Sequence, residues 1–239
     1  MGRTEARQAR RSQADATVLA PMTARRTSAL LLTGALVIAG CGSSKSSSSP
    51  TSSSTAATAS TQTGPQLGFE GVPIEQGRDL APASSTQTGK VDGIACRPIE
   101  QLQYHIHAHL AVYVGGALRA LPGGVGIPGS SVVQSAEGPV ATGGQCIYWL
   151  HTHAPDGVIH IESPVRRIYT LGNFFDEWHQ PLSASQVGLA TGPVSAFVNG
   201  KPWTASPRAI PLLPHAVIQL DVEMPLTPFQ TMSWTQTQL

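Results

Sequence analysis

The sequence predicts a mainly β fold: one small sandwich-like or barrel-like domain of short antiparallel strands with a single short helix. Apolar and polar residues alternate in several short runs, as they do in strands that bury one face. Gly115-Gly116 and Asn199-Gly200 interrupt such runs and are typical of tight hairpin turns. Residues 170–179 carry the apolar period of a helix instead.

Residues 1–40 are expected to include a secretory signal peptide. Met22-Thr-Ala-Arg-Arg26 is basic, and the apolar run 29–39 that follows is too short to be relied on as a membrane span. Because a complete signal begins at Met22, we expect translation to start there and residues 1–21 to lie upstream of the true start.

The signal ends in Ile38-Ala-Gly-Cys41, which resembles the lipobox of bacterial lipoproteins. The resemblance implies cleavage before Cys41 and lipidation of its thiol. The chain would then be exported and anchored to the bacterial cell membrane, with its domain on the extracytoplasmic side. An ordinary signal or anchor with an accidental cysteine is the alternative.

Residues 41–90 are expected to form a disordered, Ser/Thr-rich tether. The tract up to about Pro65 has one lysine and almost nothing apolar, so burial cannot offset its ordering entropy. Large apolar residues are also sparse in 66–90, which either packs on the domain as irregular chain or continues the tether. The domain proper is expected to span 91–239, enough for one core.

The charge of the exported chain excludes nucleic acid as a partner. From Cys41 onward, 9 lysines and arginines face 12 aspartates and glutamates, a net charge of −3. No basic surface remains to hold phosphates. The sequence identifies no protein partner.

Cys96 and Cys146 are the cysteines left after lipidation of Cys41. An even pair in an oxidising compartment most simply forms a disulfide, which would join the chain just before the two histidine-rich strands described below. The alternative is that both thiolates are soft metal ligands.

The first half of the domain is expected to contain one long strand and a return strand. Residues 102–114 alternate, with His105, His107 and His109 on one side and apolar residues on the other. Gly115-Gly116 turns the chain into a second strand over 117–121. Residues 122–129 are too rich in Gly and Pro for regular structure, and 130–145 offer only a short strand around Val132-Val133.

The stretch Tyr148–Glu162 predicts a β-hairpin around the turn Ala154-Pro-Asp-Gly157. Closing the arms over this turn places His151 opposite His160. One face then carries His151, His153, His160 and Glu162. The other face carries Leu150, Thr152, Ile159 and Ile161 and suits a core.

The last third combines the helix with further strands. Thr170 can cap a helix whose apolar stripe is Leu171, Phe174, Phe175 and Trp178, and Pro181 ends it. A hairpin over 194–198 and 201–204 follows, and then a strand over 216–222.

Six of the eight histidines therefore lie on two strand faces, which points to a transition metal. Such an ion needs three or four ligand atoms within about 2.0–2.3 Å. Residues i and i+2 on a strand are about 6.6 Å apart, and cross-strand pairs about 5 Å. We expect His151, His153 and His160 to bind Zn or Cu, with one or more further ligands from His105, His107 and His109. His179 and His215 are expected to be ordinary histidines.

The arrangement is similar to that of α-carbonic anhydrases, in which an H-x-H on one strand and a histidine from a neighbouring strand hold zinc, although the surrounding sequence does not match. The pattern L-H-T-H-x-x-x-G-x-I-H-I-E over 150–162 resembles one in uncharacterised secreted bacterial proteins, and this resemblance implies no activity.

Three functions remain open. A cell-surface lipoprotein could bind Zn or Cu with every coordination position filled by protein. A hydrolase or hydratase could hold the ion with three histidines and use Glu162 as general base. A metal-free, pH-responsive histidine cluster in a structural or interaction protein is the third. Glu162 is accordingly a ligand, a partner that orients an imidazole, or a base.

Overall fold

The computed structural model describes residues 64–83 and 87–239. The expected signal peptide over 1–40, the start at Met22 and the lipidated Cys41 all lie outside the described residues. Within the described part of the chain, no helix has both the length and the apolar character needed to cross a membrane.

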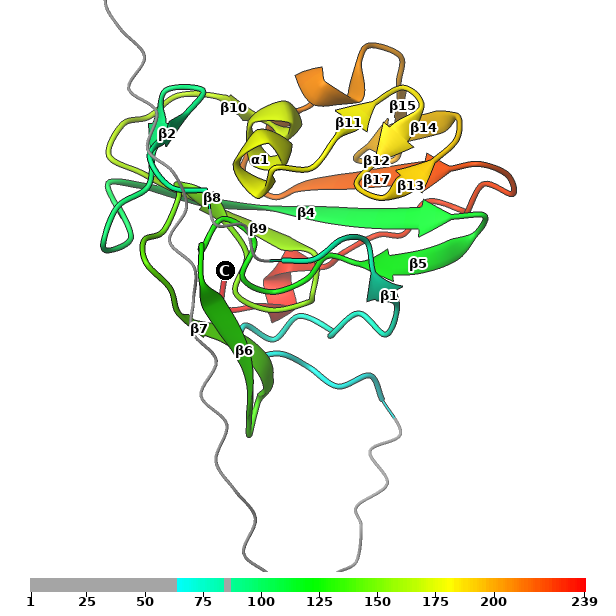
Figure 1. Ribbon diagram of the computed structural model, residues 1–239. Helices are drawn as coiled ribbons and strands as arrows, with labels where there is room; N and C mark the ends of the chain where they lie inside the picture. Colours follow the sequence, from blue (N-terminus) through cyan, green and yellow to red (C-terminus); the bar gives the residue numbers. More distant parts are fainter. Residues whose placement is uncertain (1–63, 84–86) are drawn as a thin grey trace, which may run out of the picture. The chain divides into compact units, whose positions relative to one another are not determined.

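The described residues confirm a mainly β fold with one short helix. The principal sheet is open and has eight strands (Figure 1). These strands are β1 (Arg78–Asp79), β4 (Tyr104–Val114), β5 (Ala117–Ala120), β8 (Leu150–His151), β9 (Val158–Ser163), β14 (Val194–Val198), β15 (Lys201–Trp203) and β17 (Ala216–Val222). The order along the sheet is β1-β5-β4-β17-β14-β15, while β9 pairs with β4 and β8 pairs with β9.

Strand β4 organises the sheet because it has partners along both edges. Its first half pairs antiparallel with β9 and its last three residues pair antiparallel with β5. Its other edge pairs with β17 in parallel, with Ala108 opposite Ala216. The expected strands are thus confirmed here, but two pairings, β4 with β17 and β1 with β5, are parallel rather than antiparallel.

Four small sheets surround the principal one. They comprise β2 (Lys90–Val91) with β3 (Ile94–Ala95), β6 (Ser130–Ser135) with β7 (Gly138–Gly143), β10 (Tyr169–Thr170) with β16 (Pro211–Leu212), and β11 (Leu182–Ser183) with β12 (Gln186–Val187) and β13 (Ala190–Thr191). The β6–β7 hairpin replaces the single short strand expected around Val132-Val133. Strand β6 is mostly polar and almost entirely exposed, so its sequence lacks the alternation of apolar and polar residues that would predict a strand.

Helix α1 (Leu171–Trp178) confirms the predicted helix. The Thr170 hydroxyl accepts a hydrogen bond from the Asn173 backbone N–H, and the Asn173 side chain accepts one from the Thr170 N–H, so both ends of a capping box are present. The helix ends at His179, which is left-handed with φ 61°. Two short 3₁₀ helices, η1 (Pro207–Ala209) and η2 (Trp234–Gln236), complete the elements.

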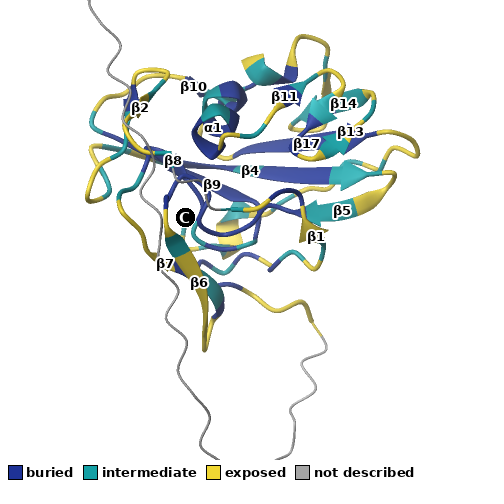
Figure 2. Cartoon of the chain, in the orientation of Figure 1, coloured by how far each residue is buried: buried dark blue, intermediate teal, exposed yellow. Residues whose placement is uncertain are grey.

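The core lies between the principal sheet and α1 (Figure 2). The helix contributes Leu171, Phe174, Phe175 and Trp178, all of them buried. They meet Leu150, Ile159 and Ile161, which are the residues expected on the inner face of the hairpin. One face of β8 and β9 is thereby fixed against the core, and the alternation of the strand sends their histidines to the opposite face.

The domain begins earlier than residue 91. Residues 64–83, assigned from the sequence to the tether, pack against the sheet: Leu80 and Ala81 belong to the core, and β1 pairs with β5. Val72 and Ile74 are buried as well. These few apolar residues are widely spaced, so their spacing matches neither a strand nor a helix. Each of them is nevertheless buried against the domain.

Candidate metal centre

Three strands bring the histidine-rich segments together. His151 on β8 pairs with His160 on β9, as the sequence predicts, and His160 pairs on its other side with His107 on β4. His105 of β4 lies opposite Glu162 of β9. Cross-strand neighbours of this kind have Cβ atoms about 5 Å apart, so their side chains meet on one face of the sheet.

The first group of potential ligands is His151, His153, His160 and Glu162. Each offers one ligand atom, and the four atoms lie within 4.8 Å of one another. The Nε2 atoms of His151 and His153 are 3.1 Å apart. Glu162 places Oε2 3.9 Å from His151 Nε2 and Oε1 3.5 Å from His160 Nδ1. In a tetrahedral zinc site with bonds of about 2.1 Å, ligand atoms are about 3.4 Å apart, so these side chains fit an ion with small movements.

His151 is held in the tautomer that a metal requires. Its Nδ1 lies 2.9 Å from the carbonyl oxygen of Tyr148 and can only donate to it. The Nε2 lone pair therefore points toward His153 and Glu162. A backbone carbonyl on the second nitrogen is a common way to orient a ligating imidazole.

The second group is His105, His107 and His160, whose ligand atoms also approach within 4.8 Å. The rings of His107 and His160 meet edge to face, 4.7 Å between centroids, and those of His105 and His107 are 4.6 Å apart. His105 Nε2 lies 3.2 Å from Glu162 Oε1. Because both groups contain His160, they form one continuous cluster rather than two separate sites.

His160 lies between two carboxylates. Its Nδ1 faces Glu162, and its Nε2 lies 3.1 Å from Oε1 of Glu70. Burial by itself lowers the pKa of His160, but the Glu162 and Glu70 carboxylates outweigh burial and raise this pKa to about 9. In the metal-free protein His160 is therefore an imidazolium at pH 7.

The imidazoles of His107, His151 and His153 are neutral. Burial, reinforced by the positive charge of His160, lowers the pKa of His153 to about 4 and that of His107 to about 3. The same two causes hold the pKa of His151 well below its ordinary range. Neutral imidazole is the form that ligates metals, so most of the cluster needs no deprotonation.

Two acidic residues of the site could not be found from the sequence. Glu70 belongs to the segment assigned to the tether, and Glu100 belongs to the irregular chain before β4. Glu100 Oε1 lies 3.4 Å from His153 Nε2, and its side chain is 36% exposed. Burial and the nearby Glu162 raise the pKa of Glu100. Neither residue carries a periodic signal, since both are placed by irregular backbone.

His109 does not join the cluster, which corrects its assignment as a ligand. It pairs with Val158, beyond the part of β9 that carries His160, and neither ligand group includes it. Its ring packs against Gly157, where a Cβ would lie 2.6 Å from Nε2 of His109. Gly157 also has φ 79°, so the predicted turn glycine meets both a conformational and a steric requirement.

His179 and His215 lie outside both ligand groups, as expected. His179 ends α1, and His215 stacks on Trp234 with 4.7 Å between ring centroids.

The cluster borders a pocket of about 380 Å³. The lining includes His105, His107, His153 and His160 together with Glu70 and Glu100, while Phe69 and the C-terminal residues Gln238 and Leu239 form part of its edge. His151 is fully buried behind it. An ion or small solute can thus reach the cluster from one side, while the core closes the other.

The Cys96–Cys146 disulfide is present, with 5.4 Å between the Cα atoms. The alternative in which both thiolates are metal ligands is therefore excluded. Next to the disulfide, Arg97 and Ile147 exchange two backbone hydrogen bonds of 2.9 and 2.7 Å. The bond fixes the segments that lead into β4 and β8, and so it helps to place the two histidine-bearing segments.

Comparison with known proteins finds no similarity: no family model matches the chain, and neither a curated protein nor a solved structure matches it.

Proposed function

We propose that this protein binds one transition metal ion, Zn or Cu, through His151, His153, His160 and Glu162. The observation that carries the proposal is the convergence of four ligand atoms within 4.8 Å from one buried hairpin. Imidazole nitrogens with one carboxylate oxygen suit Zn and Cu(II), whereas Ca and Mg prefer oxygen alone. His105 and His107 lie next to this group and would supply an additional ligand, or replace one of the four.

A structural role without metal is less favourable for these residues. Burying a cluster of imidazoles and carboxylates costs free energy unless the polar atoms find partners. Nε2 of His107 and Oε2 of Glu162 are buried without hydrogen-bond partners in the described protein. An ion would satisfy such atoms, which supports a ligand-binding role over a pH-responsive cluster.

We infer the location of the site from the sequence. With a lipid on Cys41, the chain would be tethered to the outer side of the cell membrane and would capture or buffer the ion there. The disulfide agrees with an oxidising compartment.

A metal-dependent hydrolase or hydratase is a second candidate, supported by the pocket of about 380 Å³ that borders the cluster. In this reading three histidines hold the ion and a water completes its coordination. Glu162 was the base expected from the sequence. Because it lies among the ligand atoms, the partly exposed Glu100 beside His153 is better placed to take a proton.

Calorimetric titration of the tag-free domain with Zn and Cu tests the proposal. We expect one equivalent to bind, and the His151→Ala/His153→Ala double variant to lose more than about 100-fold in affinity, since it loses two ligands. The controls are His215→Asn and His179→Asn, chosen because both histidines have a left-handed backbone that asparagine tolerates. Wild-type affinity no tighter than that of the double variant would exclude a metal role and favour the pH-responsive cluster.

A further inference from the structure

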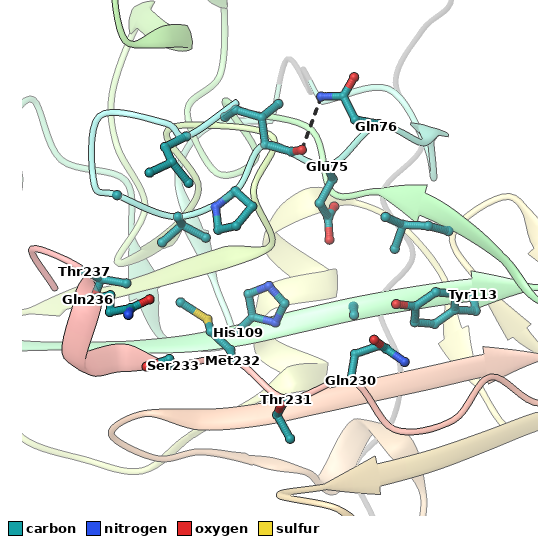
Figure 3. A pocket seen from close by; sticks show the side chains of 17 residues that line it. Glu75, Gln76, His109, Tyr113, Gln230, Thr231, Met232, Ser233, Gln236 and Thr237 are labelled. Carbon is teal, nitrogen blue, oxygen red and sulfur yellow. Dashed lines mark hydrogen bonds between the residues drawn. The ribbon is translucent and has the colours of Figure 1, made fainter. Parts of the chain in front are cut away.

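A larger pocket, of about 510 Å³, lies elsewhere on the domain (Figure 3). Its floor is the part of the principal sheet that carries His109, Ala111 and Tyr113 of β4 and Leu118 of β5. Its walls are the irregular segment 67–76 and the segment 230–237, which contains η2. It shares no lining residue with the pocket at the metal centre.

The walls are fastened to the domain, so the pocket is formed before any ligand arrives. The Gln238 backbone N–H donates to the Glu70 carbonyl at 3.0 Å, which joins the two segments. The Gln230 N–H donates to the Gln219 side-chain oxygen at 2.9 Å, which holds the C-terminal segment on β17. A preformed site avoids the entropy of ordering loops on binding.

Most of the surface that lines the pocket is apolar, although more than half of the lining residues have polar side chains, among them Gln76, Gln230 and Gln236. The apolar side chains come from both segments and from the sheet: Leu67, Val72, Ile74, Ala111, Leu118 and Met232. Among the described residues that line the pocket, none is a lysine or an arginine, and Glu75 is the only acid. An anionic ligand would therefore lose its hydration without gaining a charged partner.

Three of the polar side chains, those of Glu75, His109 and Tyr113, come together in one part of the pocket. Figure 3 shows the Glu75 carboxyl group directed between the rings of His109 and Tyr113. Nδ1 of His109 is buried and has no hydrogen-bond partner in the described protein. Glu75 Oε2 accepts a hydrogen bond of 2.8 Å from the Leu121 N–H, and among the described residues no hydrogen bond to Oε1 competes with a ligand.

We propose that this pocket binds an uncharged, largely apolar small molecule that carries a carbonyl or hydroxyl oxygen. The volume falls within the range of about 300–1,000 Å³ of ligand sites, and an apolar lining with a few convergent polar groups is their usual composition. Glu75 can donate to the ligand oxygen, because burial, as the largest influence, raises the pKa of its carboxyl group to about 8. A ligand hydroxyl can in turn donate to His109 Nδ1 or to Tyr113.

The neutral dye Nile red, which carries a carbonyl, is a direct probe of the pocket. We expect saturable fluorescence enhancement at one dye per chain, and no comparable enhancement with the anionic dye anilinonaphthalene sulfonate. Ala111→Trp fills the pocket from its floor and should weaken dye binding at least about tenfold. Met232→Trp fills it from the wall and serves if the first variant does not fold by circular dichroism. Val165→Trp, at an exposed position away from the pocket, is the matched control.

Several results would overturn this inference. They are the absence of saturable binding, equal binding of the anionic dye, and unchanged binding in both filled variants. Dimers in analytical ultracentrifugation that exclude the dye would show instead that a second copy covers the pocket. The inference is independent of the metal centre, so the His151→Ala/His153→Ala variant should bind the dye like the wild type.

Discussion

Nε2 of His160 lies 3.1 Å from Oε1 of Glu70, a residue about 90 positions earlier in the chain. This contact joins the first described segment of the domain to its proposed metal centre. Together with Glu162 on the other side of the ring, it keeps a proton on an imidazole that the proposed ion must use as a ligand.

Metal binding at pH 7 should therefore release about one proton, from His160. The pKa of His160 is about 9, whereas the pKa values of His151 and His153 are lowered, so those two are already neutral. Since the ion competes with this proton, affinity should rise with pH from 7 to 9, about tenfold per unit. Calorimetry in buffers of different ionisation enthalpy counts the released protons.

Glu70→Gln is the matched variant for this measurement. It removes one of the two carboxylates that raise the pKa of His160, so fewer protons should be released at pH 7. Zero proton release by the wild type would contradict this assignment of the ionised histidine.

The disulfide should contribute substantially to stability. The cysteines are separated by 50 residues in sequence, for which chain entropy suggests about 4 kcal/mol. The free energy of unfolding of the Cys96→Ser/Cys146→Ser variant should be lower by that amount, so its urea midpoint should fall. Reduced wild-type protein should have the same urea midpoint as the variant. Identical urea midpoints for the variant and the oxidised wild type would refute the estimate.

Glu75 should make the domain less stable as pH rises. Its pKa is raised from 4.5 to about 8, chiefly by burial, so the folded state favours the protonated form. Its contribution is fully present below pH 4.5 and is lost as pH rises through 8, at a cost of up to about 5 kcal/mol.

Glu75→Gln cannot ionise, and its amide oxygen can still accept from Leu121. Relative to wild type, the unfolding free energy of this variant should therefore increase between pH 5 and pH 8.5. Urea midpoints at the two pH values measure the effect, and Glu137→Gln, at an exposed position on the β6–β7 turn, is the control. An equal difference at both pH values would show that Glu75 does not titrate in this window.

Cys41 should carry lipid. Radiolabelled palmitate supplied to cells should enter the wild-type protein and should not enter Cys41→Ala, because the resemblance to a lipobox places the lipid on that thiol. Undiminished labelling of the variant would remove the basis for a membrane anchor.

The local features of the fold could be read from the sequence because short-range chemistry determines them. The turn at Ala154–Gly157 sets the register of the hairpin, and so the pairing of His151 with His160 was predictable. Helix α1 is likewise defined by local residues, namely the capping pair Thr170 and Asn173 and the apolar stripe that begins at Leu171. In each case the decisive residues lie within a few positions of one another.

The remaining features depend on contacts that no local pattern encodes. The parallel pairing of β4 with β17 joins segments about 100 residues apart. Glu70 and Glu100 reach the site on irregular backbone. His109 shares the period of His105 and His107, yet its position opposite Val158 places it beyond the cluster, so the period alone overstated the number of ligands.

The central position of β17 has a consequence for how the chain matures. This strand, residues 216–222, lies between β4 and β14, so one edge of β4 over residues 108–114 stays unpaired until β17 has been synthesised. Such distant pairing is slow to form, because a long loop must close first. The principal sheet can therefore close only after β17 has been synthesised. For the same reason, a chain truncated before Ala216 would lack the middle of its sheet.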